Sequence, residues 1–432
     1  MAVSGCPPAN ASSLLDISPQ PDHTSLLAVG GNLYSVIQFE SPNPAVMYMM
    51  GIAMSNNGDL SVLPGSLTAI NWAPYGGLLS PCAGSTTPWQ SHLGSEESTG
   101  VIDARDFAGY FYGTVPNYKS VSLTSFAGFM RYFGVYPAQL TNAAVIANYD
   151  PYMYGYVTEV TVTGPSAYTA VKHMSMGRAP WEMALVMPDN QTVYLTPDAS
   201  NGGFYQYYAS APGVLSAGTL SCAAFTQTAP TGHTYGGSFT INWIPMSSAP
   251  ISDATILAAI NGTANGVAGI SFDDIFVTDL PTSNVSGLCN TGFTPVNAGY
   301  GSYTAGGVTY YHECLKLNPN TTNAAVLAAT VETARYAAML GCTTEFNKWE
   351  GITYSARRNQ LYTSLSYWTS GGMLSTTNAA GVLNTADIGG SNDINLAAQP
   401  CGCVAVWLAF YRWLSSRIRA EPLGWGLLMR RI

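Results

Sequence analysis

The chain has 432 residues, enough for one large all-β domain or for two or three smaller domains. Only 9% of the residues are Asp, Glu, Lys or Arg, against roughly 25% in ordinary globular chains. The formal net charge of −9 argues against nucleic acid as a partner, because phosphate backbones are bound through Lys and Arg, and no apolar run approaches the roughly 20 residues of a membrane-spanning helix.

Short segments that alternate apolar and polar residues dominate the chain from residue 30 to residue 222. The segment Tyr156–Val162 alternates with period two, as a half-buried β-strand does. Residues 184–187 and 192–196 flank a turn of Pro, Asp, Asn and Gln, which predicts a β-hairpin. Residues 352–354 and 361–365 flank a second turn. The chain is therefore predicted to be mostly β-sheet.

The two predicted hairpins begin alike. Trp181-Glu182 opens the first hairpin and Trp349-Glu350 opens the second, and a Tyr follows each Glu twelve residues later. A β-propeller would use such a repeated strand start to aim carboxylates from different blades at one axis. A coincidence between two ordinary hairpins explains the same pattern, so both interpretations stay open at this point.

One clear helix is predicted near residues 322–341. Alanine, valine and leucine dominate this segment, and Gly341 is a typical residue just past a helix end. The segment 223–310 is rich in Gly, Ser and Thr with weak periodicity, which predicts long loops with short strands. Cys289 and Cys314 bracket a loop and are a candidate disulfide pair for an exported protein.

Both ends of the chain differ from its middle. Residues 1–27 lack the basic and apolar regions of a signal peptide, so this segment is interpreted as the start of an intracellular protein or as a truncated start. Residues 404–432 contain five arginines, three tryptophans and no lysine. We interpret this Arg-rich tail as a replaced or mistranslated terminus, with an amphipathic surface helix as the alternative.

The segment around Cys82 carries the most chemical information. This cysteine lies in a turn rich in Gly, Ser and Pro, and Glu96 and Glu97 follow 14 and 15 positions later. A thiolate with carboxylates suits iron, whereas surplus carboxylates suit calcium. A buried cysteine beside a solvated Glu pair is the competing interpretation. A zinc site is not expected, because the chain has no H-x-x-x-H or C-x-x-C spacing.

The stretch from Gly77 to Glu97 resembles the signature of the PhoX-type alkaline phosphatases, in the branch with a C-A-G-S-x-T-P-W…L-G-S-E-E pattern. The resemblance extends over most of residues 28–403 and ends after Cys401-Gly402-Cys403, where relatives continue for further blades. It implies an all-β fold in which residues 28–403 form a six-bladed β-propeller, incomplete here, with one inserted helix near residues 322–341.

The resemblance also implies an axial site that binds Fe³⁺ and Ca²⁺ and hydrolyses small-molecule phosphate monoesters. The expected metal ligands are anionic side chains at matching positions of the family's motifs: Cys82, Glu40, Glu182, Glu350 and one of Glu96 and Glu97. Glu182 stands in a G-R-x-x-x-E segment and Glu350 in a K-x-E-G segment. Lys348 stands where the family has a basic residue near the substrate phosphate, and is the expected catalytic residue.

Catalysis is expected to proceed by attack of a metal-activated water or oxo ligand on phosphorus. The resemblance further implies a secreted or periplasmic protein, although no signal peptide is visible, and a monomer is expected. An unclosed propeller would leave sheet edges exposed. The alternative hypothesis is therefore a catalytically inactive or truncated propeller that acts as a binding or structural protein.

Overall fold

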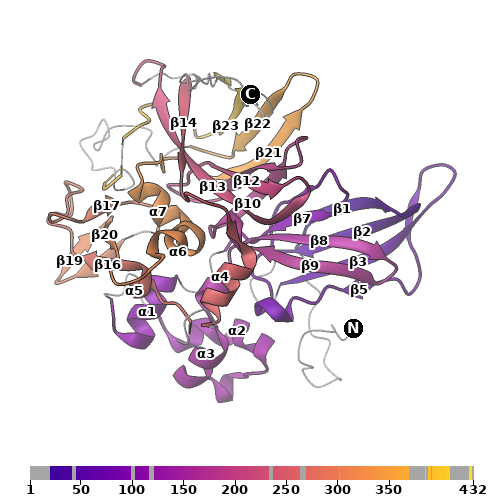
Figure 1. Ribbon diagram of the computed structural model, residues 1–432, viewed down its shortest axis with the longest axis horizontal. Helices are drawn as coiled ribbons and strands as arrows, with labels where there is room; N and C mark the ends of the chain where they lie inside the picture. Colours follow the sequence, from indigo (N-terminus) through magenta and orange to yellow (C-terminus); the bar gives the residue numbers. More distant parts are fainter. Residues whose placement is uncertain are drawn as a thin grey trace.

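The computed structural model describes residues 20–40, 45–98, 103–115, 121–232, 237–262, 269–300, 302–368, 385, 388–390, 392–408 and 428–430. Within these residues the chain is mostly β-sheet, as the sequence predicts (Figure 1). The described strands form several open sheets and close neither a barrel nor a propeller. The six-bladed propeller therefore stays a prediction.

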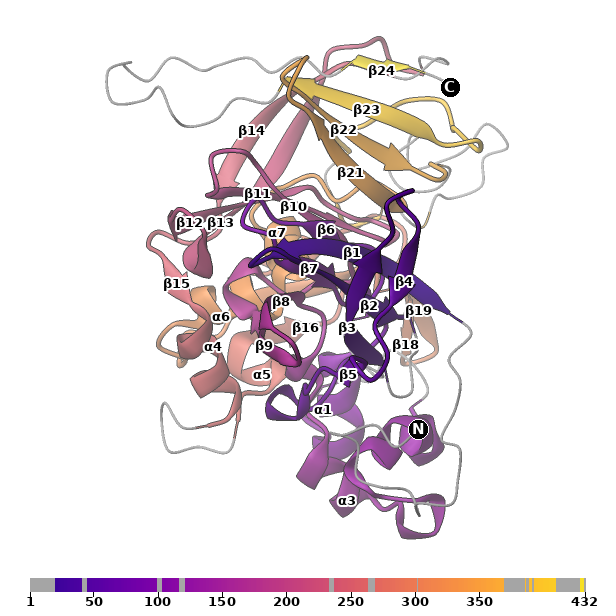
Figure 2. The ribbon, with the colours of Figure 1, turned by 90° about the vertical axis from the view of Figure 1, so that its right-hand side faces the viewer.

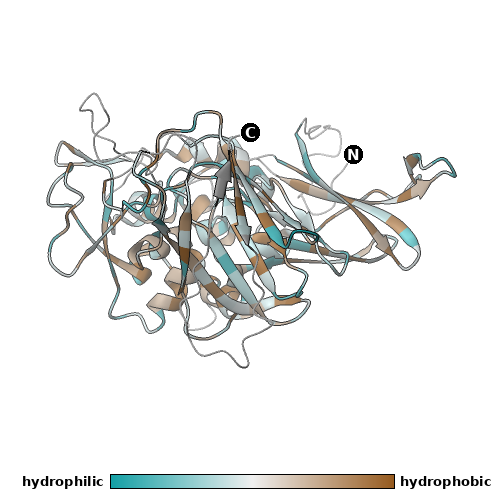
Figure 3. Cartoon of the chain, turned by 90° about the horizontal axis from the view of Figure 1, so that it is seen from above, coloured by the Kyte–Doolittle hydropathy of each residue, from teal (hydrophilic) through white to brown (hydrophobic). Residues whose placement is uncertain are grey.

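Two antiparallel sheets contain the N-terminal strands. The first sheet consists of β1 (Pro21–Val29), β2 (Asn32–Phe39), β3 (Val46–Met54) and β4 (Leu60–Val62) in that order, with β5 (Thr68–Ala69) beside β3. It projects from the body of the molecule, and Figure 3 shows hydrophobic and hydrophilic residues interspersed along it. The second sheet consists of β6 (Ser85–Thr86), β7 (His92–Ser95), β8 (Val157–Gly164) and β9 (Ala167–His173).

Two further sheets contain the predicted hairpins. One consists of β10 (Trp181–Val186), β11 (Thr192–Pro197), β12 (Tyr205–Ala211), β13 (Val214–Gln227) and β14 (Phe239–Pro245), with β15 (Ile251–Ser252) beside β13. The other consists of β21 (Trp349–Ser355), β22 (Gln360–Leu365), β23 (Cys403–Leu408) and β24 (Leu428–Arg430). Both hairpin predictions are confirmed, because β10 pairs with β11 and β21 pairs with β22.

The proposed boundary between residues 403 and 404 falls inside β23, which pairs with β22 along its whole length. Trp407 of this strand is buried. Residues 409–427 and 431–432 of the expected tail lie outside the described residues, as do residues 1–19 of the expected N-terminal segment. The interpretations of both ends therefore stay predictions.

The remaining elements are short. The remaining strands are β16 (Phe276–Asp279), β17 (Thr294–Val296) and β20 (Glu313–Leu317) in one sheet, and β18 (Tyr303–Ala305) with β19 (Val308–Tyr310) in another. The helices are α1 (Ala104–Tyr112), α2 (Ala127–Met130), α3 (Asn142–Asn148), α4 (Asp253–Ile260), α5 (Phe272–Ile275), α6 (Ala324–Val331) and α7 (Thr333–Met339). No described helix combines the length and the apolar composition of a membrane span.

The helix predicted near residues 322–341 is present as two helices, α6 and α7, which meet at Glu332. This residue leaves the helical conformation (φ −131°, ψ 42°), and its buried carboxylate accepts hydrogen bonds from Tyr152 and Arg335. The sequence analysis predicted only this helical segment, and it did not predict α1 to α5. These helices have only 4 to 9 residues, and helices this short depend on tertiary packing that local propensity does not reveal.

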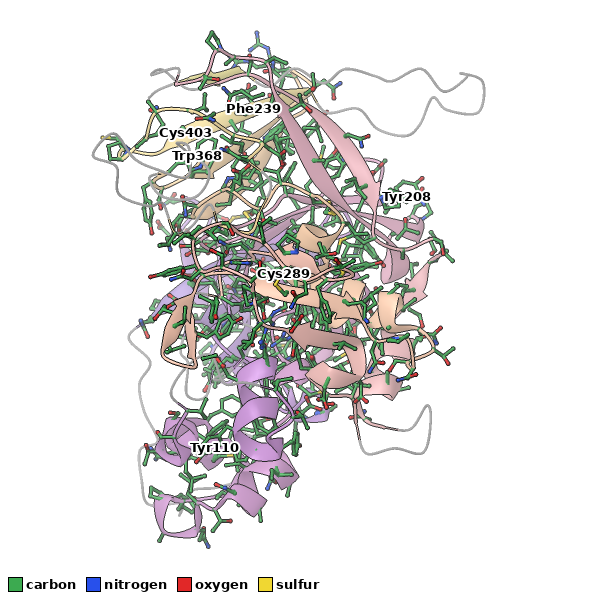
Figure 4. The ribbon with its side chains drawn as sticks, turned by 90° about the vertical axis from the view of Figure 1, so that its left-hand side faces the viewer. Tyr110, Tyr208, Phe239, Cys289, Trp368 and Cys403 are labelled. Carbon is green, nitrogen blue, oxygen red and sulfur yellow. A yellow bond between two sulfur atoms is a disulfide. The ribbon has the colours of Figure 1, made fainter. Side chains whose placement is uncertain are left out.

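The largest hydrophobic core lies between the β10–β15 sheet and the helices α4, α6 and α7. A second core joins the β10–β15 sheet to β21–β23, where Phe204 stacks on Trp407 with ring centroids 5.0 Å apart. Figure 4 shows Phe239, Trp368 and Cys403 of this second core at one end of the molecule. In Figure 2, β23 and α3 lie at opposite ends.

The described part of the chain contains two disulfides. The bond between Cys289 and Cys314 confirms the pair that the sequence suggests, with Cα atoms 5.6 Å apart. The bond between Cys222 and Cys342, with Cα atoms 5.9 Å apart, ties β13 to the segment after α7 and was not predicted.

Candidate metal centre

Three overlapping groups of acidic and thiol side chains meet at the edges of four sheets. Within each group the ligand atoms lie within 4.8 Å of one another. The groups share Cys82 and Glu182, so together they form one continuous set, which we call the acidic cluster. Its members are six carboxylates and one thiol: Asp22, Glu40, Cys82, Glu97, Glu182, Asp198 and Glu350.

Bulges in three strand pairs place carboxylates in this cluster. The pairing of β10 with β11 shifts register between Trp181 and Met183, which leaves Glu182 as the extra residue. The pairing of β21 with β22 shifts in the same way at Glu350. Asp22 lies in the shifted part of β1. A bulge changes the direction of a side chain, so the repeated Trp-Glu strand start has a structural function.

The turn around Cys82 is fixed by backbone contacts. The Cys82 amide donates to the Ser95 carbonyl at 2.9 Å, and the Gln38 side-chain amide donates to the Cys82 carbonyl. Both glycines of the surrounding motif are required by close packing: a Cβ at Gly84 would lie 2.5 Å from the Leu93 carbonyl oxygen, and one at Gly94 would lie 2.3 Å from Gln38.

The Cys82 thiol faces two carboxylates. Its Sγ lies 3.4 Å from Glu182 Oε1 and 3.7 Å from Asp22 Oδ2. Burial, followed by the negative charges of Glu182, Asp22 and Glu97, raises the pKa of the Cys82 thiol far above its ordinary range. A thiolate forms here only when a positive charge is close by, and a bound cation supplies one.

The structure separates the two adjacent glutamates that the sequence left as alternatives. Glu96 is fully buried and lies outside the acidic cluster. Its Oε1 accepts hydrogen bonds from the Leu79 amide at 2.9 Å and Lys172 Nζ at 2.8 Å, and its Oε2 accepts from the Gly155 and Tyr156 amides. Four donors occupy this carboxylate, which therefore has a structural environment.

Glu97 has the opposite environment. Its carboxylate groups with Cys82 and Glu182. Burial first, then a hydrogen bond with Asp198 and the charges of Asp198 and Glu182, raise the pKa of Glu97 to about 8. The structure thus brings Glu97 into the cluster and leaves Glu96 out of it.

Glu182 and Asp198 carry the clearest sign of a missing partner. Oε2 of Glu182 and Oδ1 of Asp198 are buried and have no hydrogen-bond partner among the described residues. Burial first, then the charges of Glu350, Asp198 and Asp22, raise the pKa of Glu182 to about 8, although a hydrogen bond from Cys82 lowers it. Buried polar atoms are normally satisfied, so these oxygens fit a cation.

Lys348 lies at the Glu350 end of the cluster. Its Nζ donates to Asp198 Oδ2 and lies 3.3 Å from Glu350 Oε1. Burial lowers the pKa of Lys348, but the hydrogen bond and attraction of Asp198 and the charge of Glu350 outweigh burial and raise it above its ordinary value. The ammonium group is therefore charged and held beside the cluster.

Sequence reasoning missed two members of the cluster, Asp22 and Asp198. Asp198 lies two residues after the predicted strand 192–196 and directly after β11, and its amide donates to the Pro180 carbonyl beside the Glu182 strand. An acidic residue at the end of the strand paired with the Glu182 strand was a usable signal. Asp22 offered no comparable signal, because its place depends on a bulge in β1.

Comparison with known proteins gives one match. The family model described as alkaline phosphatase PhoX matches residues 61–388, a range that includes Cys82, Glu97, Glu182, Asp198 and Glu350. No curated protein and no solved structure matches the chain. Since the matched range covers well over half of its residues, the chain belongs to the PhoX alkaline phosphatase family.

Proposed function

We propose that this chain is a metal-dependent phosphomonoesterase whose cations are bound by the acidic cluster. The observation that carries the proposal is the convergence of six carboxylates and the Cys82 thiol, with two buried carboxylate oxygens that have no hydrogen-bond partner in the described part of the chain. Like charges this close repel one another, and a bound cation converts the repulsion into attraction. Family membership supports phosphate esters as the substrates.

The donor types support iron and calcium. Cys82 supplies a soft sulfur beside Glu97 and Glu182, a mixed set that suits Fe³⁺. Glu182, Asp198 and Glu350 supply only hard oxygens, which suit Ca²⁺. Asp22 and Glu40 add oxygens on the other side of Cys82. We therefore assign Cys82, Glu97 and Glu182 to iron and the remaining carboxylates to calcium.

Bound cations would polarise the phosphoryl group and lower the pKa of a bound water, which is the chemistry of metal-assisted hydrolysis. Lys348 would hold a phosphate oxygen as a point charge, and Asp198 keeps the Lys348 ammonium in position. Ser85 is not the nucleophile. The residue is only 7% exposed, and its hydroxyl donates to the Ala184 carbonyl at 2.7 Å.

The two disulfides support an oxidising compartment. Disulfides such as Cys222–Cys342 and Cys289–Cys314 persist mainly in secreted and periplasmic proteins. The expected substrates in such a compartment are small-molecule phosphate monoesters outside the cytosol. We propose a secreted or periplasmic monomer that releases phosphate from them.

Metal content and turnover of the purified protein test this function. Cys82→Ser should abolish iron binding and the visible absorption of an iron–thiolate bond, and should lower hydrolysis of p-nitrophenyl phosphate by at least roughly 100-fold. The matched control is Cys403→Ser, which changes a second buried cysteine outside the disulfides. It lies in the second core, so iron content and turnover should stay at wild-type levels.

Two results would contradict the proposed function or its metal assignment. Wild-type protein that binds neither iron nor calcium and does not hydrolyse p-nitrophenyl phosphate would favour the inactive binding or structural protein. Iron retained in full by Cys82→Ser would overturn the assignment of this thiol as a ligand.

A further inference from the structure

A cavity of about 260 Å³ lies beside the acidic cluster. The loop of residues 198–203 forms one wall, and Tyr205 and residues 298–300 form others. Asp198 lines the cavity and also belongs to the cluster. A group bound at the Asp198 end of the cluster therefore has this cavity as its neighbour.

Small residues line most of the cavity, and part of the lining is polar. Alanine, glycine and proline make up most of it, and among the described residues Asp198 is the one formally charged side chain that lines it. The nearby guanidinium of Arg335 lies behind the Tyr300 ring, 3.7 Å from the ring centroid, and pairs with Asp103, Glu313 and Glu332. Lys348 pairs with Asp198 at the cluster end of the cavity, so the described lining residues offer a second anionic group no cation of their own.

Tyr205 supplies an unused hydrogen-bonding group. The residue is fully buried, and its hydroxyl has no hydrogen-bond partner among the described residues. The hydroxyl lies close to the cavity loop, because a Cβ at Gly203 would be 3.0 Å from it. A buried hydroxyl without a partner is unfavourable, so a ligand with hydroxyl or carbonyl oxygens would satisfy it.

The volume limits the ligand. Drug-sized ligands occupy pockets of about 300–1,000 Å³, and this cavity is slightly smaller. At about 30 Å³ for each molecule of liquid water, it has room for a compact group of several heavy atoms. A phosphorylated side chain on the surface of a folded protein would not enter it.

We propose that this cavity binds the alcohol part of the substrate, and that the preferred substrates are phosphate monoesters of compact, neutral, polyhydroxylated alcohols. This inference rests on the proposed phosphatase function. Tyr205 contributes to specificity by donating a hydrogen bond to an oxygen of the alcohol. The described lining residues include no cation, which disfavours alcohols that carry a second phosphate.

The test compares three esters on the metal-loaded protein: glycerol 2-phosphate, methyl phosphate and fructose 1,6-bisphosphate. The expected kcat/KM for glycerol 2-phosphate exceeds that for each of the other two by roughly tenfold or more. Tyr205→Phe should lower kcat/KM for glycerol 2-phosphate by up to roughly tenfold, the value of one hydrogen bond, and should leave methyl phosphate unchanged.

Tyr207→Phe is the matched control, since Tyr207 is also fully buried on β12. Its hydroxyl donates to the Leu215 carbonyl at 2.9 Å and lies 3.0 Å from Ser175 Oγ. This variant should lower the melting temperature and leave the preference among the three esters unchanged. Tyr205→Phe should show the reverse pattern, because it breaks no hydrogen bond among the described residues.

The outcomes separate this inference from the function on which it rests. Equal kcat/KM for glycerol 2-phosphate and methyl phosphate, with Tyr205→Phe neutral toward both, overturns the cavity assignment and leaves the phosphatase intact. A protein that binds neither iron nor calcium when both are supplied, and that hydrolyses none of the three esters, overturns the phosphatase function itself.

Discussion

Glu96 and Glu97 are adjacent carboxylates with different physical environments. Glu96 compensates the buried Lys172 ammonium at 2.8 Å, with both side chains 0% exposed. Glu97 lies among carboxylates that repel it, and its pKa is raised to about 8, chiefly by burial. The sequence identified the pair as relevant but could not separate its members, because the separation depends on which residue meets Lys172 across the sheet.

Matched substitutions to Gln should separate the two roles. Glu96→Gln leaves the Lys172 charge buried and unpaired, so the free energy of unfolding should fall by about 3–5 kcal/mol. Glu97→Gln replaces a carboxyl group whose ionised form is disfavoured by burial and by the neighbouring carboxylates, so it should leave the metal-free protein at least as stable as wild type. It should weaken iron binding by at least roughly 100-fold, since even outer-shell partners of a metal contribute about 10–100-fold.

Chemical denaturation of the metal-free variants and iron titration give the two readouts. If Glu97→Gln binds iron as wild type does and Glu96→Gln does not, the assignment of the two residues is reversed.

At the scale of the elements, the sequence predicted the strand pairs but not the bulges within them. The alternation of apolar and polar residues and the Pro-Asp-Asn-Gln turn predict where β10 and β11 lie. Each of β10 and β21 contains one extra residue relative to its partner strand. This bulge depends on the register between the two strands, which the sequence of one strand does not reveal. The sequence therefore identified Glu182 and Glu350 but could not explain their direction.

His173 connects three elements through a buried ion network. Its Nε2 lies 3.0 Å from Glu159 Oε2 of β8, and its Nδ1 lies 3.0 Å from Asp253 Oδ2 at the start of α4. Burial alone would lower the pKa of His173, but hydrogen bonds and attraction from Asp253 and Glu159 raise it from 6.5 to about 9. The folded state therefore favours the protonated imidazole.

This raised pKa predicts a pH-dependent stability. Because the folded-state pKa lies above the ordinary value, the stabilisation is fully present below pH 6.5 and disappears as the pH rises through about 9. The shift corresponds to about 3 kcal/mol. The difference in unfolding free energy between wild type and His173→Gln should be largest near pH 6 and should shrink by this amount toward pH 10.

His92→Gln is the control for this titration. Burial, followed by the charge of His23, lowers the pKa of His92 to about 3, so this fully buried imidazole stays neutral above pH 6. The unfolded imidazole has finished titrating above about pH 8, so the destabilisation by His92→Gln should be constant from pH 8 to pH 10. A constant effect of His173→Gln over the same range would contradict the ion network.

For the whole molecule, the sequence predicted an all-β chain, and the structure confirms this composition. The closed propeller depends on how sheets are placed around an axis, which local alternation does not encode, and the described strands form open sheets. The acidic cluster nevertheless collects side chains from four of these sheets: Asp22 from β1, Cys82 and Glu97 from the segments flanking β6 and β7, Glu182 from β10 and Glu350 from β21. Cations bound there would connect the four sheets.

Removal of metal should therefore destabilise the fold, and more strongly at high pH. In the metal-free protein, burial chiefly raises the pKa of Glu97 and of Glu182 from 4.5 to about 8. The folded state then holds extra protons between pH 4.5 and about 8, so its stability falls as the pH rises through this interval. Cations at 100 times their dissociation constant would restore about 2.7 kcal/mol.

Melting temperatures of chelator-treated and metal-loaded protein at pH 6 and pH 9 measure this effect. The gap between the two forms should widen toward pH 9. The contribution of His173 is present in both forms and cancels in the comparison. Glu97→Gln with Glu182→Gln removes both titrating groups, so this double variant should show a gap that is small and independent of pH. A wild-type gap that narrows toward pH 9 would mean that the cluster does not bind cations through these carboxylates, and the sheets would have to be held together by their apolar cores alone.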